Sequence, residues 1–169
     1  SVASRGRGDV YKRQARVFAA TGKREEAAKR LIAFARDSTD GTGQDHRAVA
    51  RELVHMGLEP YAISGYRRAV ERGGSDQAAA MRELADLLIR KNDEQALAEA
   101  RELYRKLWNM DRMDLAVGCA YARLLVLNRT LEEAAQVRDV LLESHGRNVE
   151  TLVLSAQVAA ASEERAVAE

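Results

Sequence analysis

The sequence has very few of the residues that break helices or cross-link chains. Of its 169 residues, one is proline, one is cysteine and 11 are glycine. Such low glycine and proline contents exclude collagen-like and low-complexity disordered chains. The lone Cys119 excludes an internal disulfide and any zinc site built from several cysteines.

Long apolar runs and a strong net charge are missing too. No run approaches the roughly 18 residues that a membrane-spanning helix needs, and no signal-peptide pattern is visible at the start. The formal net charge is +1, so no overall field favours nucleic acid or a membrane surface as a partner. The start of the sequence looks truncated, so the compartment stays open, with the cytoplasm slightly favoured.

Alanine, in contrast, recurs in two parallel series. The first series has spacings of 35, 35, 37 and 34 residues: Ala15, Ala50, Ala85, Ala122 and Ala156. The second series follows it by 12, 12, 15 and 12 residues: Ala27, Ala62, Ala100 and Ala134. A period of this length indicates a solenoid of helix pairs, in which alanine allows two helices to cross closely.

Apolar spacing within one period shows where the helices should lie. His46, Val49, Ala50 and Leu53 form one helical stripe, and Pro60 is well placed to begin the next helix. We therefore expect an all-α chain of about four and a half antiparallel hairpins, with units near 10–44, 45–75, 76–110, 111–146 and 147–169. The first helices are predicted at 10–20, 45–56, 76–91, 112–127 and 149–161, and the second helices at 24–36, 60–72, 94–109 and 131–144.

Polar residues before several helices predict caps. Thr130 with Glu133 and Asn92 with Gln95 have the spacing of capping boxes. Single N-caps are predicted at Ser75 and Asn148.

Both ends of the sequence look cut. Residues 1–14 resemble the translated linker tail of a sequenced gene fragment, so we exclude them from fold and function. The last unit stops as its second helix should begin, near Ser162. We expect the helix before it to lack a partner, which favours marginal stability or self-association.

The repeat resembles the tetratricopeptide family over residues 15–169. The paired small residues carry this resemblance, together with the turn glycines Gly22 and Gly57 and the aromatic positions Tyr66 and Tyr104. The resemblance implies a right-handed superhelix that acts as a protein-binding scaffold. The family's tryptophan in the first helix is replaced by four other residues: Tyr11, His46, Met81 and Gly118.

Chemical motifs are scarce. His46 and His55 point to opposite sides of one helix, so they cannot share a metal ion. No nucleophile–base constellation or phosphate loop is present. Cys119 is best explained as a small packing residue, and Trp108 as filler beneath a longer third turn near Lys91–Glu94. We therefore expect a non-enzymatic protein without a cofactor or metal.

One pattern points to a partner. Arginines recur on the side of the first helices that usually contacts ligands in this family, with one aspartate among them: Arg16, Arg47, Arg51, Arg82, Asp86 and Arg123. Guanidinium groups repeated in this way suit the capture of carboxylates, so we predict a concave groove for an acidic protein segment. An ordinary solvated helix face is the alternative for the pattern. For the chain as a whole, the alternatives are a docking region of a larger enzyme and a pentatricopeptide-like RNA reader.

Overall fold

The computed structural model describes residues 10, 13–18, 20–37 and 43–168. Within these residues all regular structure is helical, and none of the helices is long and apolar enough to span a membrane. The chain divides into two compact units, Ser1–Leu87 and Leu88–Glu169. Of the predicted tail at residues 1–14, only residues 10, 13 and 14 are among the described residues, and Tyr11 is not.

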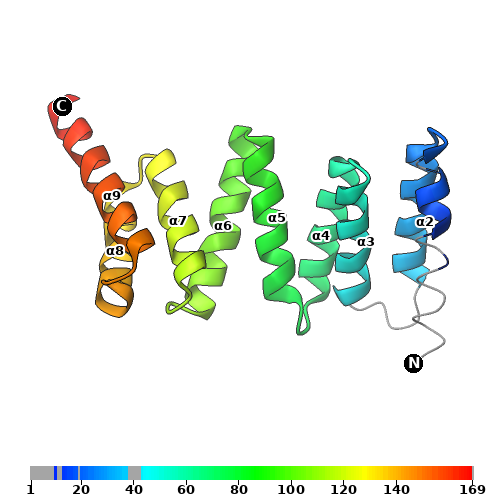
Figure 1. Ribbon diagram of the computed structural model, residues 1–169, viewed down its shortest axis with the longest axis horizontal. Coiled ribbons are helices and arrows are strands. Elements are labelled where there is room, and N and C mark those ends of the chain that lie inside the picture. The colour runs from blue at the N-terminus through cyan, green and yellow to red at the C-terminus, as the bar shows by residue number, and fades with distance from the viewer. Residues whose placement is uncertain (1–9, 11–12, 19, 38–42, 169) are drawn as a thin grey trace. The chain divides into compact units, whose positions relative to one another are not determined.

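The first unit contains α2 (Arg24–Asp37), α3 (Gly43–His55), α4 (Glu59–Arg72) and most of α5 (Gln77–Lys91). Before them, residues 13–18 are helical, inside the predicted first helix. The helices α3 and α4 pack as a hairpin, and α2 contacts α3 (Figure 1). Pro60 lies in the first turn of α4 as predicted, where no backbone donor is needed.

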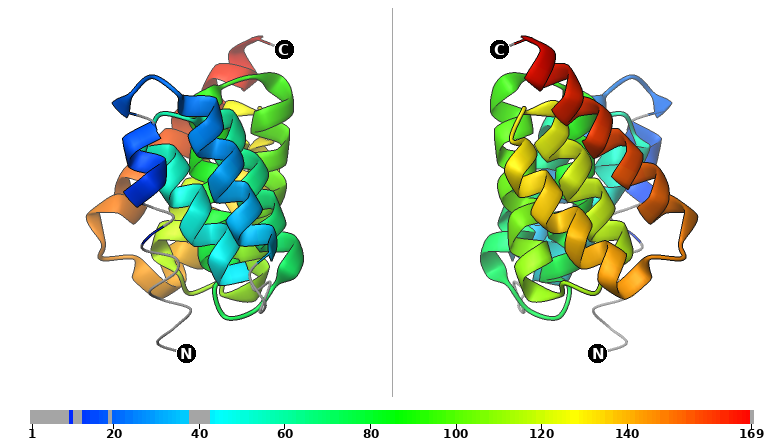
Figure 2. Two further views of the ribbon diagram at one scale, coloured as in Figure 1. Left: turned by 90° about the vertical axis from the view of Figure 1, so that its right-hand side faces the viewer. Right: turned by 90° about the vertical axis from the view of Figure 1, so that its left-hand side faces the viewer.

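The second unit contains α6 (Glu94–Met110), α7 (Leu115–Leu127), α8 (Leu131–His145) and α9 (Val149–Ala168). The hairpin of α7 and α8 contacts α6 through α7 and α9 through both of its helices (Figure 2). The last turns of α9, drawn in red, extend past the ends of α7 and α8.

The alanine series marks the packed positions almost throughout. The side chains of eight of these alanines are fully buried: Ala15, Ala27, Ala50, Ala62, Ala85, Ala100, Ala122 and Ala134. Ala156 is the exception and is exposed on α9. Its side of α9 packs against no described helix, so the periodic position is present but its packing partner is not.

Predicted and observed helix bounds agree within three residues except at α9. A new helix was predicted to begin near Ser162, but α9 continues to Ala168, and the Ser162 hydroxyl donates to the Val158 carbonyl within the same helix. This prediction was wrong because residues 149–168 contain no glycine or proline to end the helix.

The capping boxes were also wrong. The Thr130 hydroxyl donates to the Leu125 carbonyl, and it makes no cap bond to α8. Asn92 has a positive φ of 55° at the end of α5, and Asp93 caps α6 by accepting a hydrogen bond from the Ala96 amide. Both polar residues use a different local bonding geometry from the one that their spacing suggested.

The single caps had mixed outcomes. The Asn148 side chain accepts from the Glu150 amide at 2.8 Å, which confirms the predicted cap of α9. The Ser75 hydroxyl instead accepts a hydrogen bond from the Gln44 side chain, two residues before α5 begins.

The three extra residues of the third repeat lengthen its helices and not its turn. Only Asn92 and Asp93 separate α5 from α6. The helix α6 begins six residues before Ala100, whereas α4 begins three residues before Ala62. The insertion therefore adds most of a helical turn at the start of α6.

Trp108 packs far from that turn. It is 14 residues beyond Glu94 and 6% exposed, which places it roughly 21 Å along α6 from the turn. A Cβ atom added at Gly118 of α7 would lie 2.8 Å from the Trp108 ring and 2.8 Å from a methyl group of Leu141. Gly118, at the family's tryptophan position, thus makes room for a tryptophan supplied by the preceding helix.

Candidate functional site

The predicted arginines of the first unit are largely bonded within the protein. Arg47 on α3 donates from Nε and Nη2 to the two carboxylate oxygens of Glu83 on α5, at 3.0 and 2.7 Å. Its Nη1 donates to Asp76 at 2.9 Å. These bonds raise the pKa of Arg47. All three guanidinium nitrogens are therefore in use: two link α3 to α5, and the third links α3 to the residue just before α5.

Glu83 is the centre of this polar cluster. The Tyr66 hydroxyl on α4 also donates to it, and burial is the main reason why the pKa of Tyr66 is raised. Arg51 Nε lies 4.0 Å from the nearer Glu83 oxygen, and its side chain is 58% exposed. Arg51 is therefore close enough for attraction but beyond hydrogen-bond distance, and its guanidinium faces solvent.

A second arginine–glutamate pair shows the same arrangement one repeat earlier in the sequence. Arg16, in helical residues 13–18, donates Nε and Nη2 to the two oxygens of Glu52 on α3, at 2.5 and 3.0 Å. The Glu52 side chain is 8% exposed. The hydrogen bonds to Glu52 are the main cause of the raised pKa of Arg16.

Sequence reasoning missed the carboxylates that neutralise these arginines. In both pairs the acid follows the arginine by 36 residues, which is one 35-residue repeat plus one position. That offset is readable in the sequence and could have identified Glu52 and Glu83. Together with Asp76 and Asp86 they balance the formal charge of the four arginines: Arg16, Arg47, Arg51 and Arg82.

The remaining predicted residues are placed as follows. Arg82 is half-buried and Asp86 is exposed on α5, and both interact with other residues of the chain. Arg123 is exposed on α7 in the second unit. A single groove containing all of these side chains stays a prediction.

The other singled-out side chains are mostly packed inside their units. Cys119 is 2% exposed, and burial raises the pKa of its thiol, as expected for a packing residue. His46 is 4% exposed beside a cavity of about 100 Å³ among α2, α3 and α4. Burial, reinforced by Arg72 and Arg68, lowers the pKa of His46. The described residues contain no group of three or more potential metal ligands.

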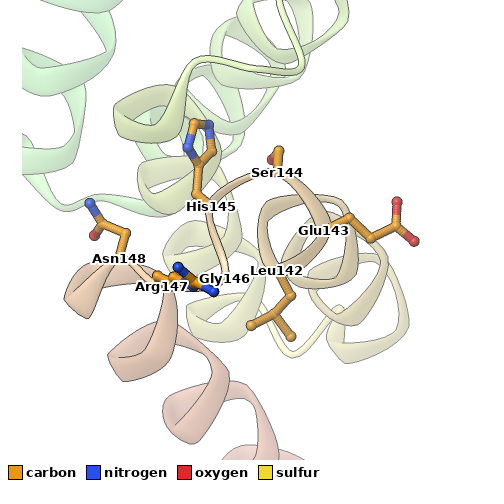
Figure 3. A pocket seen from close by; sticks show the side chains of 7 residues that line it. All are labelled: Leu142, Glu143, Ser144, His145, Gly146, Arg147 and Asn148. Atoms are coloured by element: carbon orange, nitrogen blue, oxygen red, sulfur yellow. The ribbon is translucent and has the colours of Figure 1, made fainter.

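A wide hollow of about 600 Å³ lies at the turn between α8 and α9 (Figure 3). Only the consecutive residues 142–148 line it, and the side chains of Leu142, Glu143 and Asn148 point in different directions (Figure 3). His145 Nε2 lies 2.9 Å from the Met113 carbonyl oxygen, which ties the turn to the segment between α6 and α7. This hollow is the surface of a turn and not a convergent site.

These features define an all-α repeat solenoid of helix hairpins, and its fold is that of tetratricopeptide repeat proteins. A tetratricopeptide repeat protein from Parabacteroides merdae aligns with 93% of this chain at a TM-score of 0.70 and 15% identity. The C-terminal part of a tetratricopeptide repeat protein from Cytophaga hutchinsonii aligns with 94% of this chain, at a TM-score of 0.68 and 17% identity. This chain spans 60% of the length of each of those two structures.

A third similar structure is PilF from Pseudomonas aeruginosa. It aligns with 94% of this chain and 70% of its own length, at a TM-score of 0.60 and 19% identity. No protein-family model matches the sequence, and no curated protein matches it. At 15–19% identity the similarity to these structures is one of fold.

Proposed function

We propose that the chain is a non-enzymatic scaffold that binds a peptide or helix of a partner protein along the first helices. The exposed guanidinium of Arg51 is the observation that carries the proposal. Both oxygens of the neighbouring Glu83 accept hydrogen bonds from Arg47, so Arg51 is held near the cluster with its donors facing solvent. In this proposal a carboxylate of the partner replaces water as the acceptor for the Arg51 guanidinium.

The balance of charge limits how this binding works. Glu52, Glu83 and Asp76 already pair with Arg16 and Arg47, so these two arginines contribute little attraction for an acidic segment. One exposed arginine–carboxylate pair contributes only about 0–1 kcal/mol. The affinity must therefore come mostly from apolar and backbone contacts, with Arg51 selecting an acidic residue at one position of the bound segment.

Fluorescence anisotropy with a labelled 12-residue peptide of glutamate, leucine and alanine tests this proposal. A matched peptide with glutamine in place of glutamate is the reference. Arg51→Glu should weaken binding of the acidic peptide about 5-fold, and added salt should weaken it as well. Arg24→Glu, at an exposed arginine on α2, is the control and should leave binding unchanged.

Three results would contradict the proposal: equal binding of the two peptides, no effect of Arg51→Glu, or tighter binding of a single-stranded RNA probe. The last result would favour the pentatricopeptide-like alternative.

We further propose that the chain associates with itself through α9. Leu152 and Val153 are 51% and 46% exposed on this helix, and Ala156 is exposed beside them. Small and branched apolar residues on one exposed face favour the close packing of two helices. Sedimentation velocity should show concentration-dependent dimers that Leu152→Glu removes. The control Met110→Glu, at a residue 60% exposed on α6, should not change the association.

A further inference from the structure

A small polar groove lies among α6, α7 and α8 of the second unit. Its volume is about 210 Å³. The residues lining it come from three helices and the turn after α6: Arg105, Trp108, Asn109, Arg112, Tyr121, Glu133, Gln136, Val137 and Val140. Unlike the hollow beside α9, this groove brings together segments that are far apart in the sequence.

Two charged groups at the groove already have partners. Arg105 donates from Nε and Nη2 to Glu102 at 2.9 and 2.8 Å. Glu133 accepts a hydrogen bond from the Tyr121 hydroxyl, and the Tyr121 side chain is 1% exposed. Glu133 keeps its negative charge in this hydrogen bond, so the groove contains one carboxylate beside the two arginines Arg105 and Arg112.

Three donor side chains at the groove have no such partners. Asn109, Arg112 and Gln136 are all exposed, and none of them makes a hydrogen bond or ion pair to another described residue. They come from α6, the turn after it and α8. An arginine and two amides around one hollow are a donor set for a planar anion.

We propose that this groove binds a carboxylate on a short apolar stem, such as a glutamate side chain. Arg112 pairs with the carboxylate, and the amides of Asn109 and Gln136 donate to its remaining lone pairs. The buried Trp108 and Val137, with Val140, provide apolar surface for the methylene groups of the stem. The site does not depend on the proposed function, since it uses other helices and another arginine than Arg51.

The chain offers a specific reporter for this site, because Trp108 is its only tryptophan. The indole N–H resonance in a ¹H–¹⁵N spectrum of the whole chain should shift on binding, together with the side-chain amides of Asn109 and Gln136. The probes are N-acetyl-glutamate methylamide, its glutamine analogue, a capped hexapeptide with one glutamate, and inorganic phosphate. Saturable shifts are expected with a glutamate probe and not with the glutamine analogue.

Which glutamate probe binds then identifies the source of the carboxylate. Binding of the small amide means that a free carboxylate ligand is sufficient, whereas binding of the hexapeptide alone means that the ligand is a protein segment. Arg112→Gln should weaken binding about 10-fold, as expected for a charge-assisted hydrogen bond. Arg147→Gln, an exposed arginine outside the groove, should change binding less than about 2-fold.

The inference is overturned if neither glutamate probe gives a saturable shift, if the glutamine analogue binds equally well, or if phosphate binds more tightly. It is also overturned if Arg112→Gln binds as the unmodified chain does. Tyr121→Phe gives a separate check on the role of Glu133. Loss of the hydroxyl leaves the Glu133 carboxylate without this hydrogen-bond donor. Binding of the glutamate probe should then weaken, whereas the binding of peptides at Arg51 should not change.

Discussion

The two units have the same helix-hairpin architecture but hold neighbouring helices together differently. In the first unit, Arg16 and Arg47 pair with carboxylates 36 residues away on the next first helix. In the second unit, pairs such as Arg105–Glu102 and Arg138–Asp139 join residues of the same helix. There, Trp108 packs between helices instead, over Gly118.

This difference follows from the composition of the first helices. The helix α7 is almost wholly apolar, with the sequence LAVGCAYARLLVL, whereas α3 carries six ionisable residues in GQDHRAVARELVH. A repeat fold requires small residues where its helices cross, and the surrounding contacts can be polar or apolar. Substitutions in each unit should therefore have effects that differ in kind as well as in size.

The largest expected effect is the loss of the apolar contact in the second unit. Trp108→Ala should reduce the free energy of unfolding by about 3–5 kcal/mol, because the ring fills the space above Gly118. Urea unfolding followed by circular dichroism measures this, since the substitution removes the only tryptophan. A loss below about 1 kcal/mol would mean that this ring does not hold α6 to α7.

The next effect tests the alanine positions. Ala122→Leu should overpack α7 and destabilise the chain by about 1–3 kcal/mol, because Ala122 is fully buried. Ala156→Leu is a matched control at the equivalent position of α9, where the side chain is exposed. It should change stability by less than about 0.5 kcal/mol. Equal effects of the two substitutions in urea unfolding would show that Ala156 is also packed.

The third test compares the ion pairs of the two units. Glu83→Gln removes the charge that binds Arg47 and should cost about 1–3 kcal/mol. Glu102→Gln makes the same change at an exposed pair within α6 and should cost less than about 0.5 kcal/mol. Hydrogen exchange should show faster opening of α3 and α5 only in the first variant. Similar costs would contradict the contrast between the units.

The sequence predicted the helix hairpins well and the bonding of individual cap residues poorly. The alanine spacing predicted the hairpins because each series follows one close helix crossing. The continuation of α9 was also readable, since residues 149–168 lack glycine and proline, but the expected repeat length outweighed that signal. The caps at Thr130 and Asn92 could not be predicted from spacing alone, because each side chain had several neighbouring backbone groups to bond.

The candidate site was harder to predict. The spacing showed that Arg47 and Arg51 lie on a first helix, and this is confirmed. Whether a guanidinium meets solvent or a carboxylate depends on the side chains of the neighbouring first helix. The 36-residue offset between repeats identifies Glu52 and Glu83, but the pattern of one helix taken alone does not contain it. The donor groove in the second unit was missed for the same reason, because Asn109 and Gln136 are brought together only by the packing of α6 with α7 and α8.

The smallest predicted effect is a pH dependence carried by His46 in the first unit. Because burial lowers its pKa in the folded chain, the unfolded chain binds more protons once the pH falls below the ordinary histidine value of about 6.5. Arg68 and Arg72 on α4 oppose protonation, whereas Asp45 on α3 favours it; from α2, Ile32 and Ala35 line the adjoining cavity. Stability should therefore be highest above this value and decline as the pH falls from about 6.5 towards 5.5.

The slope of unfolding free energy against pH should become shallower in His46→Leu, even if that variant is less stable at every pH. His55→Gln, at an exposed histidine of the same helix, should keep the original slope. If His46→Leu kept it as well, the pH dependence would have to originate outside the α2–α4 cavity.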